Sequence, residues 1–401
     1  MLNIWKGVGT MLNFNYSIPT KIFFGKGQIE VLGREIKKYG SKVLIVYGKG
    51  SIKKTGIYNE AVNILKDNNI DYWELADVDP NPRITSVREG IKICKEKEID
   101  FILPIGGGSS IDCAKVIGAG YYYDGDPWDL LIGKAKVKNS LPIGTVLTLS
   151  ATGSEMDTGA VITNMETNQK LSVGHPTMVP KFSILDPEYT FTVPKNQTAA
   201  GVADIMSHVF ESYFSRTKEA YLQDRMAEAI LKTCIKYGKI AINEPENYEA
   251  RSNIMWASSL AINGLLGYGK GKDFKWSVHA IEHELSAYYD ITHGVGLAIL
   301  YPNWMRHVLD DENVYKFVEY GINIWSIDRN KNDYVIANEA IDKTREYFNS
   351  LGLPATLEEV GIGKENLDKM AKAAVDHNKG TVGSFKPLAY DDVLNIYMAS
   401  L

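Results

Sequence analysis

The chain has 401 residues, about twice the size of a typical domain, so we expect two domains. An apolar fraction of 45% and a charged fraction of 23% are ordinary for a globular protein and exclude a disordered or collagen-like chain. A net charge of -5, without a basic stripe, indicates no nucleic-acid partner. Apolar runs such as residues 116–123 are far shorter than the ~20 residues that cross a bilayer, so no membrane partner is expected.

The beginning of the chain and its cysteines indicate where the protein works. Residues 1–10 contain one lysine and no apolar core of signal-peptide length, so secretion is not indicated. Because the stretch from Met11 repeats the opening MLN, we interpret residues 1–10 as an added extension or an alternative start. Cys94, Cys113 and Cys234 are far apart and form no Cys-X-X-Cys pair, which is typical of packing thiols in a reducing cytoplasm. We therefore expect a cytoplasmic protein.

From about residue 41 to residue 148, short β-rich runs alternate with amphipathic helical stretches. Strands are predicted over residues 43–47, 71–75, 100–105 and 141–149, and helices over 54–69, over 83–98 and from 111 onward. This alternation predicts a parallel sheet with helices on both faces. The preceding stretch 14–24 is aromatic and alternating, so we interpret it as a strand pair or an arm.

Long helical patterns dominate beyond about residue 186, and β-branched runs become scarce. Helices are predicted over residues 197–215, 220–242, 248–266, 274–289 and 333–351. The change in texture predicts an α/β domain over residues 11–186 and a helical domain over residues 187–401.

A glycine-rich turn follows the predicted strand 100–105. It consists of Gly106, Gly107, Gly108 and Ser109, and the helix begins directly after it. Small residues allow a close approach of the backbone, and the N–H groups of a helix N-terminus attract phosphate. The turn is not the common G-X-G-X-X-G fingerprint, and a plain tight turn is the alternative. Asp112, in the first turn of the helix, either stabilises the helix dipole or orients a hydroxyl or phosphate of the ligand.

A second polar loop follows the predicted strand 141–149. It contains Thr148 and Thr152 among several other hydroxyl residues. Ligands gather at the carboxyl ends of parallel strands, so hydroxyl groups there suit phosphate and ribose. One such loop alone is usually a turn, but two in the same α/β half favour a bound dinucleotide.

Five residues of the second half are of the kind that binds metals. Asp204 and His208 are four positions apart, as are His279 and His283, and each spacing places both side chains on one helix face. His293 follows in a glycine-containing stretch that we interpret as a turn. One carboxylate with several imidazoles suits Fe²⁺ or Zn²⁺. Taken singly, each pair also fits a surface pair, a helix cap or a core histidine.

These motifs together resemble the iron-containing, group III alcohol dehydrogenases. Residues 183–211 resemble the first signature of that family and residues 276–296 the second, while GGGSSIDCAK and TLSATGSE are similar to its cofactor loops. The resemblance extends from about residue 14 to the C-terminus, with the four motifs in the family's order. It is closest to the clostridial-type, NADPH-dependent butanol dehydrogenases and related aldehyde reductases.

The resemblance implies a dehydroquinate synthase-like fold. In this fold an N-terminal Rossmann-like dinucleotide-binding α/β domain is followed by an all-α metal-binding domain, and the active site lies in the cleft between them. The implied ligands of Fe²⁺, with Zn²⁺ as the alternative, are Asp204, His208, His279 and His293. His283 is implied near the metal, either as the proton donor of catalysis or as a residue that shapes the pocket. The cofactor positions of the family fall on Gly48, Asn81, Gly106, Gly107, Gly108, Ser109, Thr148, Thr152 and Lys170.

The activity implied by the resemblance is hydride transfer between NAD(P)H and short-chain aliphatic aldehydes such as butanal. The substrate is then a small alcohol or aldehyde, and a homodimer is expected. The alternatives are a glycerol or short-diol dehydrogenase of the same superfamily and a non-catalytic protein that binds metal and nucleotide.

Gly48 bears on the choice of cofactor. Members of the family that prefer NAD carry an aspartate at this position, where its carboxylate would bind the ribose and repel a 2′-phosphate. Glycine leaves room for that phosphate, and Lys49, Ser51 and Lys53 follow closely. We therefore expect NADP(H) to be favoured, with NAD(H) as the alternative. The lysines also fit the solvated start of a helix.

Overall fold

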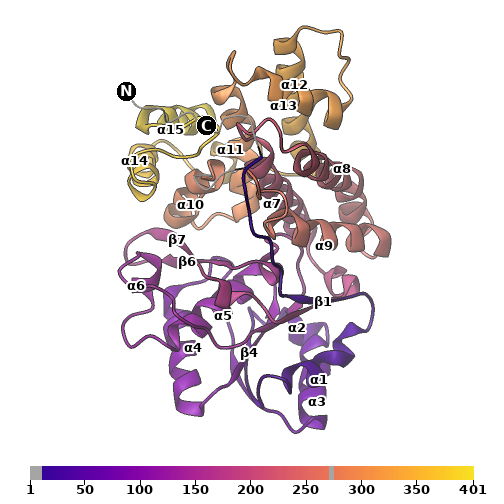
Figure 1. Ribbon diagram of the computed structural model, residues 1–401, viewed down its shortest axis with the longest axis vertical. Coiled ribbons are helices and arrows are strands. Elements are labelled where there is room, and N and C mark those ends of the chain that lie inside the picture. The colour runs from indigo at the N-terminus through magenta and orange to yellow at the C-terminus, as the bar shows by residue number, and fades with distance from the viewer. Residues whose placement is uncertain (1–10, 271–274) are drawn as a thin grey trace. The chain divides into compact units, whose positions relative to one another are not determined.

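The computed structural model describes residues 11–270 and 275–401, so the interpretation of residues 1–10 lies outside the described part. The chain forms two compact units (Figure 1). One comprises Ser17–Pro194 and Glu244–Ser259; the other comprises Lys195–Asn243 and the described parts of Met1–Tyr16 and Leu260–Leu401.

Each unit combines segments that are separate in the chain. The sequence instead predicts a single boundary between residues 11–186 and residues 187–401, and that division stays a prediction. Residues 244–259 group with the α/β unit. The reason is that Met255 of helix α9 (Tyr248–Ile262) packs in a buried cluster with Ile111, Leu147 and Leu185 of that unit. Residues 11–16 group with the helical unit, where the ring of Phe14 lies 5.5 Å from that of Tyr268.

The α/β unit contains a parallel sheet of six strands, which confirms the predicted fold class. Its order is β1 (Lys21–Phe24), β8 (Phe182–Leu185), β5 (Gly144–Leu147), β4 (Phe101–Gly106), β2 (Lys42–Val46) and β3 (Asp71–Leu75). The stretch 14–24 contributes only β1, so the interpretation as a strand pair was wrong. An antiparallel hairpin of β6 (Gly159–Asn164) and β7 (Gln169–Gly174), which the sequence analysis missed, completes the strands.

Alternate side chains of the central strands enter two separate cores. Val43 and Ile45 pack with residues of α1 (Leu32–Ile36) and α3 (Ile57–Asp67). Leu44 and Val46 pack with residues of α4 (Ile84–Lys97) and α5 (Gly108–Gly120). Both faces of the sheet are therefore covered, which explains why its strands are continuous apolar runs. The short elements of this unit are α2 (Ser51–Lys54), α6 (Trp128–Leu131), and the 3₁₀ turns Gln28–Val31, Ser154–Met156, Pro176–Met178 and Pro187–Thr190.

The second unit is built of helices (Figure 1, orange to yellow toward the C-terminus). They are α7 (Lys195–Tyr213), α8 (Tyr221–Asn243), α10 (Val278–Tyr289), α11 (His293–Val308), α12 (Val314–Trp325), α13 (Asp333–Ser350), α14 (Leu367–His377) and α15 (Tyr390–Ala399), with one 3₁₀ turn at Glu358–Val360. In neither described range is any helix long and apolar enough to cross a membrane.

The core between the sheet and helices α1 and α3 yields a stability prediction. Phe101 is fully buried there, and its ring stacks on Phe182 at 5.8 Å. We expect Phe101→Ala to lower the free energy of unfolding by about 3–5 kcal/mol, because it removes buried apolar surface and leaves a cavity. Denaturant unfolding followed by circular dichroism measures the change. Tyr122→Ala is the control, since that ring is 49% exposed, and an equal loss in both variants would contradict the prediction.

Candidate metal centre and nucleotide-binding loops

Helix α7 supplies the first two residues of a buried polar cluster. Asp204 and His208 are one helical turn apart, and the Nε2 atom of His208 lies 3.6 Å from Oδ1 of Asp204. Both side chains are only 4% exposed, and nearly the whole of α7 is buried. The predicted placement on one helix face therefore also places the pair in the core.

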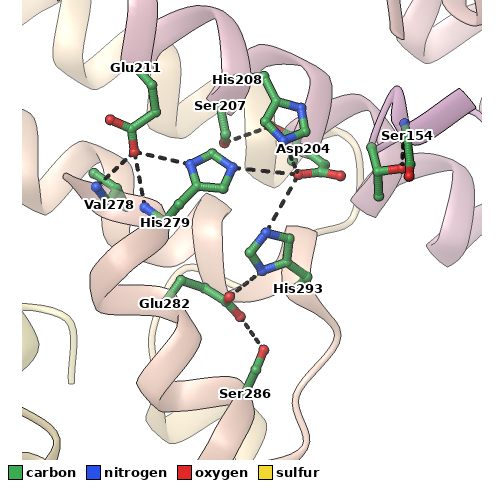
Figure 2. A network of polar contacts seen from close by, with 12 residues as sticks. Ser154, Asp204, Ser207, His208, Glu211, Val278, His279, Glu282, Ser286 and His293 are labelled. Carbon is green, nitrogen blue, oxygen red and sulfur yellow. Dashed lines mark hydrogen bonds and ion pairs between the residues drawn. The ribbon is translucent and has the colours of Figure 1, made fainter. Parts of the chain in front are cut away.

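Two further helices bring histidines to the same carboxylate oxygen (Figure 2). His279 of α10 has Nε2 3.9 Å from Oδ1 of Asp204, and His293 has Nε2 3.8 Å from it. The prediction of a turn at His293 was wrong, since α11 begins at this residue. Gly294 allows the approach of α11 to α7, because a Cβ atom there would lie 2.0 Å from the carbonyl oxygen of Ala200.

Several polar atoms of this cluster have no hydrogen bond to any described residue. They are Oδ1 of Asp204, Nδ1 of His208 and Nε2 of His279, all buried. Asp204, His279 and His293 each offer a ligand atom within 4.8 Å of the others. Buried polar atoms without partners are unfavourable unless something binds them. The donor set of carboxylate oxygen and imidazole nitrogen fits Fe²⁺ or Zn²⁺.

The cluster controls the protonation of its own members. Burial disfavours the ionised form of Asp204, but His208, His293 and His279 together hold the pKa of its carboxyl well below the usual range. Burial lowers the pKa of His208 to about 3, so this imidazole is neutral near pH 7. Burial also opposes protonation of His279, yet Asp204 and Glu211 raise its pKa to about 9. The carboxylate therefore attracts positive charge into the cluster.

Two buried carboxylates behind the histidines were missed in the sequence analysis. Glu211 contacts His279, and Glu282 contacts His293, in each case at Nδ1 (Figure 2). Their spacing was the available signal: Glu211 lies seven positions after Asp204, and Glu282 lies three after His279, so each shares a helix face with a predicted ligand.

His283 lies at the edge of this cluster. Its ring is 5.6 Å from that of His293, and it offers a ligand atom within 4.8 Å of those of Glu282 and His293. The structure thus brings together all five residues predicted from the metal-ligand pattern, with His283 beside His293.

In the α/β unit, the two polar loops lie side by side. The N–H of Thr148 donates to the carbonyl of Gly106 at 3.0 Å. A Cβ atom at Gly108 would lie 2.3 Å from Oγ1 of Thr152, so glycine is required for this approach. Gly107 and Gly108 stand where β4 ends and α5 begins, with the helix N-terminus at the loop. The arrangement suits the phosphates of a dinucleotide.

The remaining cofactor candidates of this unit also meet. Ser109 donates a short hydrogen bond to the carbonyl of Pro80, beside Asn81. Lys170, brought in by β7, donates to Oδ1 of Asn81 at 3.0 Å. Lys170 and Asn81 are each only 5% exposed, so Lys170 is not a solvated surface lysine.

Asp112 takes part in an internal network. Its carboxylate accepts hydrogen bonds from Oγ of Ser154 at 2.6 Å and from the N–H of Val161 at 2.8 Å. Burial raises its pKa to about 6. The fully buried Lys115, missed in the sequence analysis, donates to Ser154 and Asp157. Asp112 thus stabilises the end of the polar loop through its hydrogen bond with Ser154. Its role as a cofactor contact stays a prediction.

Gly48 follows β2, and its lysine neighbours are ion-paired. A Cβ atom at Gly48 would have Val78 carbonyl oxygen at 3.4 Å as its nearest neighbour, so a side chain fits. Lys49 lies 3.5 Å from Asp79, and Lys53 lies 3.1 Å from Glu74. The space predicted beside Gly48 is present, while both lysines already contact carboxylates.

A parallel sheet with phosphate-type loops and a buried carboxylate–imidazole cluster on helices are the features of a metal-dependent dehydrogenase. Residues 19–187 match the profile described as "Iron-containing alcohol dehydrogenase". Residues 198–401 match the one described as "Fe-containing alcohol dehydrogenase family, C-terminal". The chain therefore belongs to the iron-containing alcohol dehydrogenase family.

Individual relatives agree over their full length. "NADH-dependent butanol dehydrogenase A" of Clostridium acetobutylicum is 67% identical, covering 97% of this chain and 100% of the relative. "NADPH-dependent aldehyde reductase YqhD" of Escherichia coli is 38% identical, with coverage of 97% and 100%. The crystal structure of NADH-dependent butanol dehydrogenase A from Thermotoga maritima superposes with a TM-score of 0.93 at 37% identity, covering 98% of this chain and 99% of that one. The predicted fold, family and class, an NAD(P)-dependent alcohol dehydrogenase or aldehyde reductase, are confirmed.

The cluster around Asp204 yields a prediction about metal retention. We expect His208→Ala to lose most of its bound metal, because the variant lacks one imidazole nitrogen of the cluster. Metal per chain is measured by elemental analysis after anaerobic reconstitution with Fe²⁺ or Zn²⁺, with circular dichroism to verify that the helices persist. His377→Ala is the matched control, since this histidine contacts Glu284 outside the Asp204 cluster. Full metal content in His208→Ala would contradict the ligand assignment.

Proposed function

We propose that this chain reduces short-chain aliphatic aldehydes, such as butanal, to alcohols with a reduced nicotinamide dinucleotide in a metal-dependent reaction. The observation that carries the proposal is the Oδ1 atom of Asp204, which is buried, has no hydrogen bond among the described residues, and faces three imidazole nitrogens. The butanol dehydrogenase and aldehyde reductase named above support the substrate class.

In this proposal Asp204, His208, His279 and His293 hold the divalent cation. When bound, the cation supplies Lewis-acid polarisation of the carbonyl group and stabilises developing negative charge. The four side chains contribute a single negative charge, so the site keeps a net positive charge toward the substrate. Fe²⁺ is our first choice, in keeping with the family, and Zn²⁺ is the alternative that the same donor set accepts.

We assign the α/β unit the task of holding the nicotinamide dinucleotide. The backbone N–H groups at the start of α5 bind its phosphates, with Thr148 and Thr152 of the adjacent loop. The buried Lys170 and Asn81 bind further polar groups of the same ligand. When bound, the reduced nicotinamide supplies the hydride.

We assign His283 the role of donating the proton that the product alcohol must receive. Its ring lies 5.6 Å from that of His293, close to the cluster but not against Asp204. An imidazole is suited to this task, because its unperturbed pKa lies close to physiological pH.

The cofactor preference is proposed from Gly48. A glycine at this position leaves space for a 2′-phosphate, so we propose that NADPH is accepted and favoured. The relative from Clostridium acetobutylicum is named NADH-dependent, and the two lysines near Gly48 are ion-paired, so NADH is the alternative. We also retain the predictions of a homodimer and of a cytoplasmic location, which sedimentation and cell fractionation test.

A turnover assay tests the reaction. Metal-free protein is reconstituted anaerobically with Fe²⁺ or Zn²⁺, and absorbance of the reduced nicotinamide is followed with butanal and either NADPH or NADH, with a chelated control. We expect metal-dependent oxidation of the cofactor. Faster oxidation of glycerol or a short diol than of butanol would favour the diol dehydrogenase alternative. No turnover with metal bound would favour a non-catalytic binding protein.

The space beside Gly48 yields a prediction about cofactor choice. We expect Gly48→Asp to raise the ratio of KM for NADPH to KM for NADH about tenfold or more, because a carboxylate at this position repels the 2′-phosphate. Gly48→Asn is the matched control, since it has nearly the same volume and no charge. An unchanged ratio in Gly48→Asp would show that the phosphate is recognised elsewhere.

A further inference from the structure

Two of the three histidines around Asp204 are backed by buried carboxylates. Nδ1 of His279 lies 3.0 Å from Oε1 of Glu211, and Nδ1 of His293 contacts Oε2 of Glu282 (Figure 2). The side chains of Glu211 and Glu282 are 3% and 0% exposed. Each contact uses the ring nitrogen on the side away from Asp204.

These contacts decide which nitrogen of each ring carries the proton. A carboxylate only accepts hydrogen bonds, so Nδ1 of His279 and Nδ1 of His293 each carry a proton and donate a hydrogen bond to the glutamate. In the neutral imidazole, Nε2 then presents its lone pair, and Nε2 is the atom that faces Asp204 in both residues. Rotation of either ring would break the bond to the glutamate.

His208 lacks such a partner. Its Nδ1 atom is buried and makes no hydrogen bond to any described residue. The ring is held by packing instead, stacked on His279 with centroids 4.8 Å apart and 5.5 Å from the ring of Trp276. The three imidazoles are therefore oriented in two different ways.

We propose that Glu211 and Glu282 are positioning residues of the metal centre, which set the tautomer and orientation of His279 and His293. The inference rests on the metal site of the proposed function. Hydrogen bonds from ligand histidines to carboxylates orient the rings and raise their basicity, and losing one typically weakens metal binding about 10–100-fold.

Glu282 is itself held in place. Oγ of Ser286, one turn further along α10, donates to Oε1 of Glu282 at 2.6 Å. A Cβ atom at Gly296 would lie 2.8 Å from the same oxygen, so glycine at this position makes room for the carboxylate. Ser286 and Gly296 thus confine Glu282 against His293.

Glu211 has a second task, which makes Glu282 the better test. Its carboxylate also accepts the backbone N–H groups of Ser277, Val278 and His279, the first turn of α10. Substitution of Glu211 would therefore disturb the helix even without metal. Glu282 contacts the side chains of His293 and Ser286.

Glu284 provides a matched control on the same helix. It is 2% exposed and, like Glu282, contacts an Nδ1 atom, here that of His377 at 2.8 Å. His377 does not belong to the Asp204 cluster. Glu284→Gln therefore makes the same chemical change in a buried carboxylate–histidine pair that does not face the metal.

The experiment compares wild type, Glu282→Gln, Ser286→Ala and Glu284→Gln as full-length, metal-free proteins. Zn²⁺ affinity is measured by competition with a chromophoric chelator, and the absorption bands of bound Co²⁺ report the ligand geometry. We expect Glu282→Gln to bind Zn²⁺ about 10–100-fold more weakly with altered Co²⁺ bands, Ser286→Ala to show a smaller loss, and Glu284→Gln to match wild type. Melting temperatures without metal identify variants that are merely unfolded.

A wild-type Zn²⁺ affinity and Co²⁺ spectrum in Glu282→Gln would overturn the proposal. If Glu282→Gln does not fold, Ser286→Ala decides, and an unchanged affinity there overturns it. Wild type that binds metal without turnover would refute the proposed reaction and leave this inference standing. Wild type that binds no metal would overturn both.

Discussion

A buried carboxylate oxygen without a hydrogen bond among the described residues is the constraint on which the helical unit depends. Asp204 is ionised inside the protein, where an unpaired charge costs several kcal/mol by order of magnitude. Imidazoles from α7, α10 and α11 surround that oxygen, so three helices meet at one atom. Gly294 permits the meeting, because any Cβ atom there would collide with the backbone of α7. The cluster around Asp204 therefore constrains how α7, α10 and α11 pack.

Buried charge is handled differently in the α/β unit. Lys115 is fully buried, and its Nζ atom donates to Ser154, Asp157 and the carbonyl of Gly159. Each proton of this ammonium group has an acceptor, so the network needs no ligand and serves to fix the polar loops. Around Asp204, by contrast, several buried polar atoms have no hydrogen bond to a described residue. The contrast separates a buried group whose hydrogen bonds are satisfied within the chain from buried atoms that have none among the described residues.

Local sequence patterns predicted the features that depend on residues close together in the chain. The strand predicted over residues 71–75 is β3, and Asp204 and His208 share a helix face as the spacing required. The start of α11 was missed because glycines follow His293, and glycine usually marks a turn. The convergence of three helices on one oxygen, and the Lys170 contact with Asn81 across 89 residues, follow from tertiary packing that no local period encodes. Glu211 and Glu282, by contrast, share helix faces with predicted ligands, so their spacing could have identified them.

The two lysines near Gly48 are not equally available to a 2′-phosphate. Lys49 and Asp79 are both exposed, with side chains 72% and 38% accessible, and such surface pairs contribute little to stability, so Lys49 can exchange partners readily. Lys53 is more constrained: its Nζ lies 3.1 Å from Glu74 and within 5.0 Å of the ring centres of Tyr47 and Tyr58. Glu74 in turn accepts hydrogen bonds from both tyrosine hydroxyls. The two ion pairs therefore do not weigh equally against the proposed preference for NADPH, because Lys49 is held less firmly than Lys53.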